Sequence, residues 1–177
     1  MSNWNKIFKP IVVLCVICIV VTGALAATNS VTAPIIEAAT LAAQEAARTE
    51  LLPDAQGFEK VEGINVANVS DVYRTTNDVG VVITSSAKGY GGDVVVMTAI
   101  TPDGTIKQIK VTEQAETKGI GSNVAANADY WTRYEGLASD HELVLNQDVD
   151  AYTGATISSR AVLSAVNSAI AAYNQIP

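Results

Sequence analysis

The sequence is poor in the residues that build metal sites and nucleophilic active sites. Its 177 residues include one histidine, His141, and two cysteines, Cys15 and Cys18, inside an apolar run. One histidine cannot complete a multi-histidine site, and the chain beyond Cys18 has no thiolate for a cluster or a disulfide. The Cys-x-x-Cys pair is interpreted as small apolar residues, with a redox or metal role as the alternative. We expect no catalytic residue and no metal site.

Basic residues are also in short supply. Lysine and arginine number 11 against 18 aspartates and glutamates, which gives a formal net charge of −7. Lys6 and Lys9 precede the apolar run, so the rest of the chain is more acidic still. An acidic domain repels the phosphates of nucleic acids and of anionic lipids. Nucleic acid is therefore not an expected partner.

The apolar run predicts a membrane-spanning helix. No residue in 11–27 is charged, and residues 8–27 would form a helix about 30 Å long, which spans a bilayer core. A cleaved signal peptide is the alternative because Ala24-Leu25-Ala26 fits a cleavage site, although the apolar core is long for one. In both cases Lys6 and Lys9 place the N-terminus in the cytoplasm and the C-terminal part outside.

The remaining chain predicts an α+β domain. Thr28–Pro34 is a polar connector, followed by an alanine-rich helix over Ile35–Leu52. A turn at Pro102-Asp103-Gly104 lies among segments typical of strands: Asp71–Thr75, Val79–Ser85, Asp93–Thr101, Thr105–Thr112 and Glu142–Leu145. Helical periodicity is found over Asn123–Tyr134 and Ile157–Asn174. We expect residues 35–177 to form one domain, a twisted antiparallel sheet with packed helices, tethered by residues 1–34 with their single transmembrane helix.

The most informative segment is 150–160, Asp-Ala-Tyr-Thr-Gly-Ala-Thr-Ile-Ser-Ser-Arg. Its small residues let the backbone approach a ligand closely. Three hydroxyls then stand at the start of a helix, where unpaired backbone N–H groups favour phosphate; they belong to Thr156, Ser158 and Ser159. An ordinary turn followed by a helix cap is the alternative from this chemistry alone.

Two glycine-rich segments accompany this one. Lys88-Gly89-Tyr90-Gly91-Gly92 is either a tight loop or the wall of a ligand pocket, with Tyr90 offering an aromatic face. Glu116-Thr117-Lys118-Gly119-Ile120-Gly121 follows a predicted strand. It lacks the third glycine and the βαβ unit of a dinucleotide fingerprint, so the residues alone predict a loop before the next helix.

These motifs resemble those of a known family. Asp150, Thr153, Gly154, Ala155 and Thr156 match the flavinylation motif Asp-x-x-(Ser/Thr)-Gly-Ala-Thr of the FMN-binding domains in bacterial Rnf and Nqr complexes. In that family a flavin transferase joins FMN through its phosphate to the last threonine. The resemblance therefore implies covalent FMN, held by a phosphoester to Thr156.

The second glycine-rich loop resembles the family's Glu-Thr-Pro-Gly-Leu-Gly signature, which lies beside the flavin. Lys118 and Ile120 replace its proline and leucine. The lysine implies a positive charge near the cofactor, which would stabilise reduced flavin. The resemblance thus implies a cofactor site made of Thr156, Asp150, Thr153, Gly154, Ala155, Ser158, Ser159, Tyr90, Glu116, Thr117, Gly119 and Gly121.

The order of motifs is similar to that of the RnfG family, which provides one membrane-anchored flavin subunit of each Rnf complex, with the NqrC family as relatives. The resemblance implies a single-pass cell-membrane subunit that carries electrons on the outer side. Its complex would couple electron flow between ferredoxin and NAD to sodium or proton export. Implied partners are a membrane flavin subunit, iron–sulfur membrane subunits, the flavin transferase and lipid around residues 8–27.

Other functions remain open at this point. An NqrC-like subunit, or a stand-alone exported flavoprotein feeding an extracellular reductase, would carry the same motif. A non-redox binding module would use Thr-Gly-Ala-Thr only to begin a helix.

Overall fold

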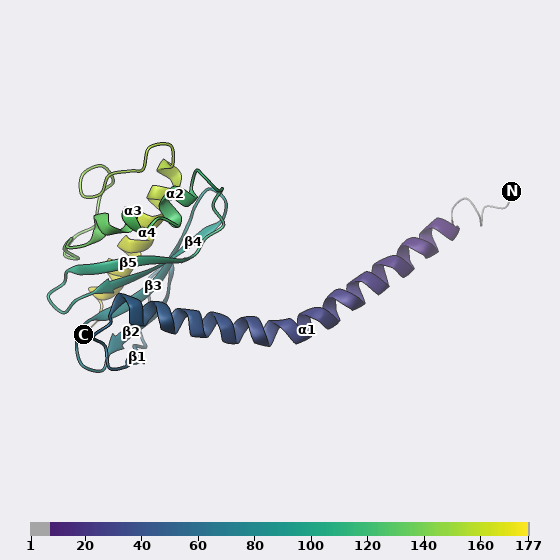
Figure 1. Ribbon diagram of the computed structural model, residues 1–177, viewed down its shortest axis with the longest axis horizontal. Helices are drawn as coiled ribbons and strands as arrows, with labels where there is room; N and C mark the ends of the chain where they lie inside the picture. The colour runs from purple at the N-terminus through teal and green to yellow at the C-terminus, as the bar shows by residue number, and fades with distance from the viewer. Residues whose placement is uncertain (1–7, 177) are drawn as a thin grey trace. The chain divides into compact units, whose positions relative to one another are not determined.

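The computed structural model describes residues 8–176, and the chain divides into two units, Met1–Ala43 and Gln44–Pro177. The first unit contains most of a long helix, α1 (Lys9–Leu51) (Figure 1). The second contains the last turns of α1, the sheet and the other helices. The boundary lies within α1, whereas the sequence suggested a boundary after residue 34. Lys6, in the expected cytoplasmic tip, lies outside the described residues.

The prediction of a connector between two helices is wrong, because α1 continues without interruption through residues 28–34. The hydroxyls of Thr28 and Thr32 donate hydrogen bonds to the carbonyls of Ala24 (2.9 Å) and Thr28 (3.1 Å). Polar side chains that bond to their own helix do not require a loop. Pro34 removes only one backbone donor, and the alanine-rich sequence after it favours the helix.

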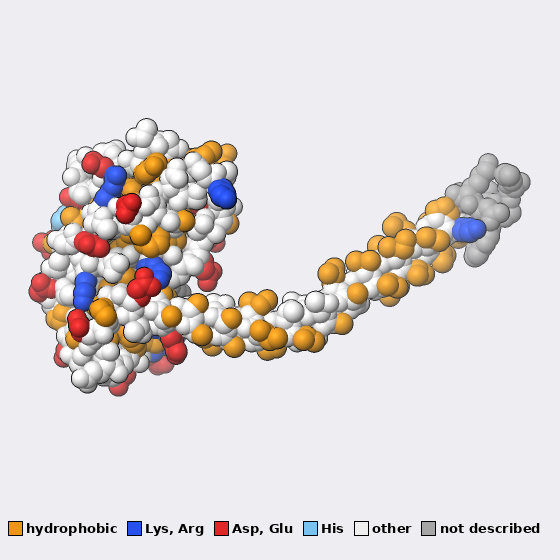
Figure 2. Space-filling view, viewed as in Figure 1, with side chains coloured by type: hydrophobic (Ala, Val, Ile, Leu, Met, Phe, Trp, Pro, Cys, Tyr) orange, Lys and Arg blue, Asp and Glu red, His pale blue; other side chains and the backbone are white. Residues whose placement is uncertain are grey.

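The surface of α1 is apolar along most of its length (Figure 2). It is the one helix among residues 8–176 that is long and apolar enough to cross a membrane. Its large apolar side chains are exposed, and Cys15 and Cys18 are exposed with them. Such a surface is unfavourable in water, so it requires lipid or another apolar partner.

Five antiparallel strands pair in sequence order: β1 (Phe58–Lys60), β2 (Val69–Thr75), β3 (Val81–Lys88), β4 (Asp93–Ile100) and β5 (Ile106–Glu113). Four match predicted strands, and β1, only three residues long, was not predicted. The predicted hairpin turn is confirmed. Gly104 has a φ of 78°, and its N–H donates to the carbonyl of Thr101 at 2.9 Å.

Each face of the sheet carries its own core. The last helix, α4 (Thr156–Tyr173), covers one face, where its Val162 and Val166 belong to the same buried cluster as Ile83 (Figure 1). On the other face, Leu51 at the end of α1 is buried in a cluster with Val82. Successive residues of β3 thus enter opposite cores, as the two-residue period of a strand requires. The predicted antiparallel α+β fold is confirmed, with α4 starting one residue earlier than expected.

The chain between β5 and α4 differs from the prediction. Instead of one helix over Asn123–Tyr134 it forms α2 (Ser122–Ala125), α3 (Ala128–Trp131) and a 3-10 turn, η2 (Thr132–Tyr134). The interruption occurs because Asn127 has extended backbone, and its side chain accepts a hydrogen bond from the N–H of Asp129 at 3.0 Å.

The predicted strand at Glu142–Leu145 is also wrong. The segment keeps only a single bridge between Leu145 and Val149. Asn146, between them, has a φ of 63°, a left-handed conformation that turns the chain instead of extending it.

Candidate functional site

The carboxylate of Glu116 joins all three motif segments. Its Oε1 accepts hydrogen bonds from the backbone N–H groups of Tyr90 (2.8 Å) and Gly91 (3.2 Å). Its Oε2 accepts one from the hydroxyl of Ser158 in the first turn of α4, at 2.7 Å. We call these four residues the Glu116 cluster. Segments that are distant in the sequence are therefore held together by one side chain.

Glycine is required around this carboxylate because backbone lies against it. A Cβ atom at Gly89 would overlap Oε1 of Glu116, and one at Gly121 would overlap Oε2. A Cβ at Gly91 would overlap the carbonyl oxygen of Ala115. These glycines therefore serve close packing, a role that the sequence predicted only in general terms.

Thr156 is the first residue of α4, and its side chain is exposed. Gly154 makes the turn before it with a φ of 82°, and the N–H of Ala155 donates to the carbonyl of Tyr152 at 3.0 Å. Ala155 occupies the N-cap position and provides no side-chain hydrogen bond. The first N–H groups of a helix have no partner within the helix, so this end presents unpaired donors next to the Thr156 hydroxyl.

The two serines of the motif are placed differently from Thr156. Both are buried, and the Ser158 hydroxyl donates to Glu116. The Ser159 hydroxyl donates to the carbonyl of Ala155 and accepts from the N–H of Tyr152, each at 3.0 Å. Their protons are thus used inside the protein, where they fix the turn. Binding of phosphate by these two hydroxyls stays a prediction.

The backbone of Asp150 is held by a residue that sequence reasoning missed. Nη1 of Arg133 donates to the carbonyl of Asp150 at 3.0 Å, and its guanidinium lies 5.0 Å from the centre of the Tyr130 ring. The N–H of Ala151 donates to Oδ1 of Asn146 at 3.0 Å. No sequence signal could have found Arg133, because the contact depends on how α3 and η2 fold.

Exposed apolar side chains gather in the same motif segments. Tyr90 is 72% exposed, Ile120 56% and Ile157 53%. Tyr90 belongs to the Glu116 cluster, and Ile157 directly precedes Ser158 in the chain. Thr117, Lys118 and Gly119 are exposed as well, and Gly119 has a φ of 83°. A large apolar side chain is seldom left in water without a purpose when others surround it.

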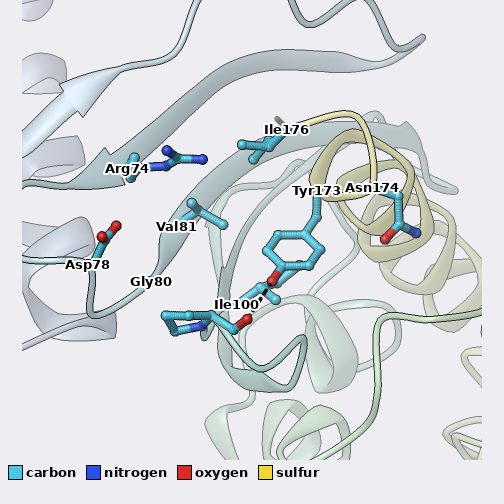
Figure 3. A pocket seen from close by; sticks show the side chains of 9 residues that line it. Arg74, Asp78, Gly80, Val81, Ile100, Tyr173, Asn174 and Ile176 are labelled. Carbon is cyan, nitrogen blue, oxygen red and sulfur yellow. Dashed lines mark hydrogen bonds between the residues drawn. The ribbon is translucent and has the colours of Figure 1, made fainter.

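The cavity in Figure 3 does not contain the motif residues. It has a volume of about 510 Å³ and lies beside Tyr173, at the opposite end of α4 from Thr156. Arg74 and Asp78 contribute from the β2–β3 region, and the Tyr173 hydroxyl donates to the carbonyls of Thr101 and Pro102. This cavity is therefore separate from the candidate site.

His141 lies in the loop region between η2 and α4, and its side chain is exposed. Its Nδ1 is 2.6 Å from Oδ1 of Asp140, and its Nε2 is 3.8 Å from Oδ1 of Asp148. The hydrogen bond with Asp140 raises the pKa of His141 and lowers the pKa of Asp140. No cluster of three or more His, Cys, Asp or Glu side chains in residues 8–176 is placed to hold a metal ion.

Comparisons with known proteins agree with these motifs. Residues 89–171 match the family described as FMN-binding domain, and residues 1–51 match the RnfG N-terminal region. The chain is 33% identical to the RnfG-type subunit of the Na(+)-translocating ferredoxin:NAD(+) oxidoreductase complex of Acetobacterium woodii, over 98% of this chain and 95% of that protein. It is 28% identical to the corresponding subunit of the proton-translocating ferredoxin:NAD(+) oxidoreductase complex of Clostridium ljungdahlii, over 96% and 92%.

Among solved structures, NqrC of Shewanella oneidensis is similar over 62% of this chain and 61% of its own, with 25% identity and a TM-score of 0.48. The fold described above therefore rests on this chain's own strands and helices. From the similarity over nearly the whole length and the two matched regions, the chain belongs to the RnfG family and contains an FMN-binding domain.

Proposed function

We propose that this chain is the RnfG subunit of a membrane-bound ferredoxin:NAD oxidoreductase complex and carries electrons on FMN esterified to Thr156. The observation that carries the proposal is the exposed Thr156 hydroxyl at an uncapped helix start, inside the matched FMN-binding domain. The relatives are named for sodium and for proton translocation. The proposal therefore includes coupling to export of one of these ions.

The start of α4 suits a phosphate. A phosphodiester on Thr156 would place a negative charge at the positive end of the helix dipole, beside N–H groups that lack partners. In the attachment step the bond between Thr156 Oγ and phosphorus forms as a phosphoanhydride bond of an activated flavin nucleotide breaks. The hydroxyl proton leaves to the flavin transferase, and no electrons are transferred.

The exposed apolar residues suit the flavin ring. Tyr90, Ile120 and Ile157 would each bury apolar surface against an aromatic ring held nearby. Bound FMN supplies the redox chemistry, and the protein supplies binding, orientation and electrostatics. The chain's own residues would thus hold the phosphate and cover part of the ring.

The N-terminal helix suits a membrane anchor. Residues 8–27 of α1 would lie in lipid, with the FMN-binding domain on the outer side. There a covalent link prevents loss of a cofactor that cannot be replaced. The other Rnf subunits, namely the membrane flavin subunit and the iron–sulfur membrane subunits, would exchange electrons with it. A flavin transferase would act on it during maturation.

Intact mass and in-gel flavin fluorescence after denaturation test this proposal. Wild-type protein from cells that contain the transferase should gain the mass of one FMN less one water. Thr156→Ala should lose both signals, and Ser164→Ala, exposed on the same helix, should keep them. An unmodified wild type would remove the proposed role, and fluorescence that persists in Thr156→Ala would move the attachment elsewhere. Copurification with membrane subunits separates a complex subunit from a stand-alone flavoprotein.

A further inference from the structure

The side chain of Glu116 is an acceptor surrounded by donors. It is 9% exposed, although Thr117, Lys118 and Ile120 just after it are exposed. Two backbone N–H groups and one hydroxyl donate to its two oxygens. A buried carboxylate is costly unless hydrogen bonds compensate it. The chain supplies such bonds here, from both of the other motif segments.

We propose that Glu116 is the positioning residue of the flavin site, and that its buried negative charge lowers the midpoint potential of the flavin. This inference rests on the proposed attachment of FMN to Thr156. Glu116 acts through its neighbours: it fixes the 90–91 backbone and the first turn of α4, and these present the ring-covering side chains and the acceptor hydroxyl.

The geometry supports the positioning role. The carboxylate of Glu116 bonds to the 90–91 backbone through one oxygen and to α4 through the other. The Ser158 hydroxyl is two residues from Thr156, so the bond to Glu116 fixes the turn that carries the acceptor. The backbone of Gly89 and Gly121 encloses the carboxylate, which leaves it little freedom to move. A reacting group that is displaced by about 1 Å can react about a hundredfold more slowly.

The charges around the cluster support the electrostatic role. Lys60, Lys107 and Lys110 form ion pairs with carboxylates on other parts of the domain. No ion pair between residues 8–176 engages Glu116, so its charge is offset by hydrogen bonds alone. A fixed negative charge near a flavin opposes the addition of electrons and lowers its potential.

Four variants separate the two roles, with loading by the co-expressed transferase, melting temperature and flavin midpoint potential as readouts. Glu116→Gln keeps an oxygen acceptor for Tyr90 and Gly91 and an amide beside Ser158, but removes the charge. Glu116→Ala removes all three bonds, and Ser158→Ala removes only the one to α4. Glu113→Gln, exposed at the end of β5, is the matched control for loss of a charge.

We expect Glu116→Ala to load flavin about tenfold to a hundredfold more slowly than wild type. Ser158→Ala should load several-fold more slowly with a smaller change in melting temperature. Glu116→Gln should load within about twofold of wild type, since its shape is kept, but with a raised midpoint potential. Glu113→Gln should match wild type in loading and shift the potential less than Glu116→Gln.

Loading of Ser158→Ala at the wild-type rate would overturn the positioning role, and this variant decides the question if Glu116→Ala fails to fold. An unchanged midpoint potential in Glu116→Gln would overturn the electrostatic role. Failure of the proposed function looks different, because wild-type protein itself would then carry no flavin, and this inference would fall with it.

Discussion

The hydroxyl of Ser158 donates a 2.7 Å hydrogen bond to Oε2 of Glu116, which lies 42 positions earlier in the chain. This bond ties the start of the last helix to the loop that follows the sheet. A motif that looks local in the sequence is therefore completed by a residue from a distant segment. The predictions below follow from this contact and from the charges around it.

Gly121→Ala should destabilise the FMN-binding domain and slow its flavin loading. Its new Cβ would overlap Oε2 of Glu116 and lie 2.6 Å from Oγ of Ser158, so the cluster must shift at a cost of about 1–3 kcal/mol. Denaturant unfolding measures the cost. Gly57→Ala is the control, because its nearest neighbour is the Thr76 side chain at 3.3 Å. Equal stability of the two variants would contradict the prediction.

Gly154→Ala should cost about 1 kcal/mol for a different reason. Nothing lies within 4 Å of the new Cβ, but the φ of 82° is unfavourable for any residue with a side chain. Unfolding measurements should show that Gly154→Asn loses less, since asparagine tolerates this conformation better. An alanine variant as stable as wild type would show that the turn relaxes freely.

Arg133→Met should lower the free energy of unfolding by about 0.5–1 kcal/mol. The change removes the hydrogen bond to the Asp150 carbonyl and the contact with the Tyr130 ring. Arg160→Met is the control, because Arg160 is exposed and forms no ion pair with the residues that the structure describes. The idea is lost if both variants unfold at the same denaturant concentration.

Lys118→Gln should lower the midpoint potential of the bound flavin. Lys118 is exposed in the loop that begins at Glu116, and a cation there favours the form that carries more electrons. Redox titration of the loaded protein measures the shift. Lys107→Gln, whose lysine pairs with Asp54 at 3.6 Å, should leave the potential close to that of wild type. An unshifted potential in Lys118→Gln would refute the role.

The His141–Asp140 pair should make stability depend on pH above the usual histidine pKa. The pKa of His141 is raised in the folded state, so its contribution is complete below the unfolded pKa and is lost as pH rises through the folded pKa. We expect the unfolding free energy to fall between about pH 6 and pH 8. His141→Gln should flatten that fall, and an unchanged slope would contradict the prediction. Asp140, whose pKa is lowered, makes the pair lose strength again in acid.

The sequence predicted the parts of the fold that local patterns determine. The periodicity of α4 and the β-branched residues of β3 and β4 specify their elements strongly, and the predicted bounds were close. Helix α1 was misread as two pieces, because threonines that bond to their own helix look the same in sequence as threonines of a linker.

The site was predictable in its residues but not in its contacts. Family resemblance indicated Glu116 and Ser158 separately as cofactor residues. Their bond to each other arises only when β5 and α4 are brought together by the folded core, and Arg133 meets Asp150 for the same reason. Tertiary contacts of this kind leave no local pattern.

The exposed side chain of Thr156 has a consequence for biosynthesis. A hydroxyl that faces solvent in the finished fold can be reached by an enzyme without any unravelling of the polypeptide. Maturation can therefore follow secretion, and apoprotein isolated without its prosthetic group remains ready to receive it. The same accessibility would permit isotopically labelled or chemically altered flavins to be installed in the purified polypeptide.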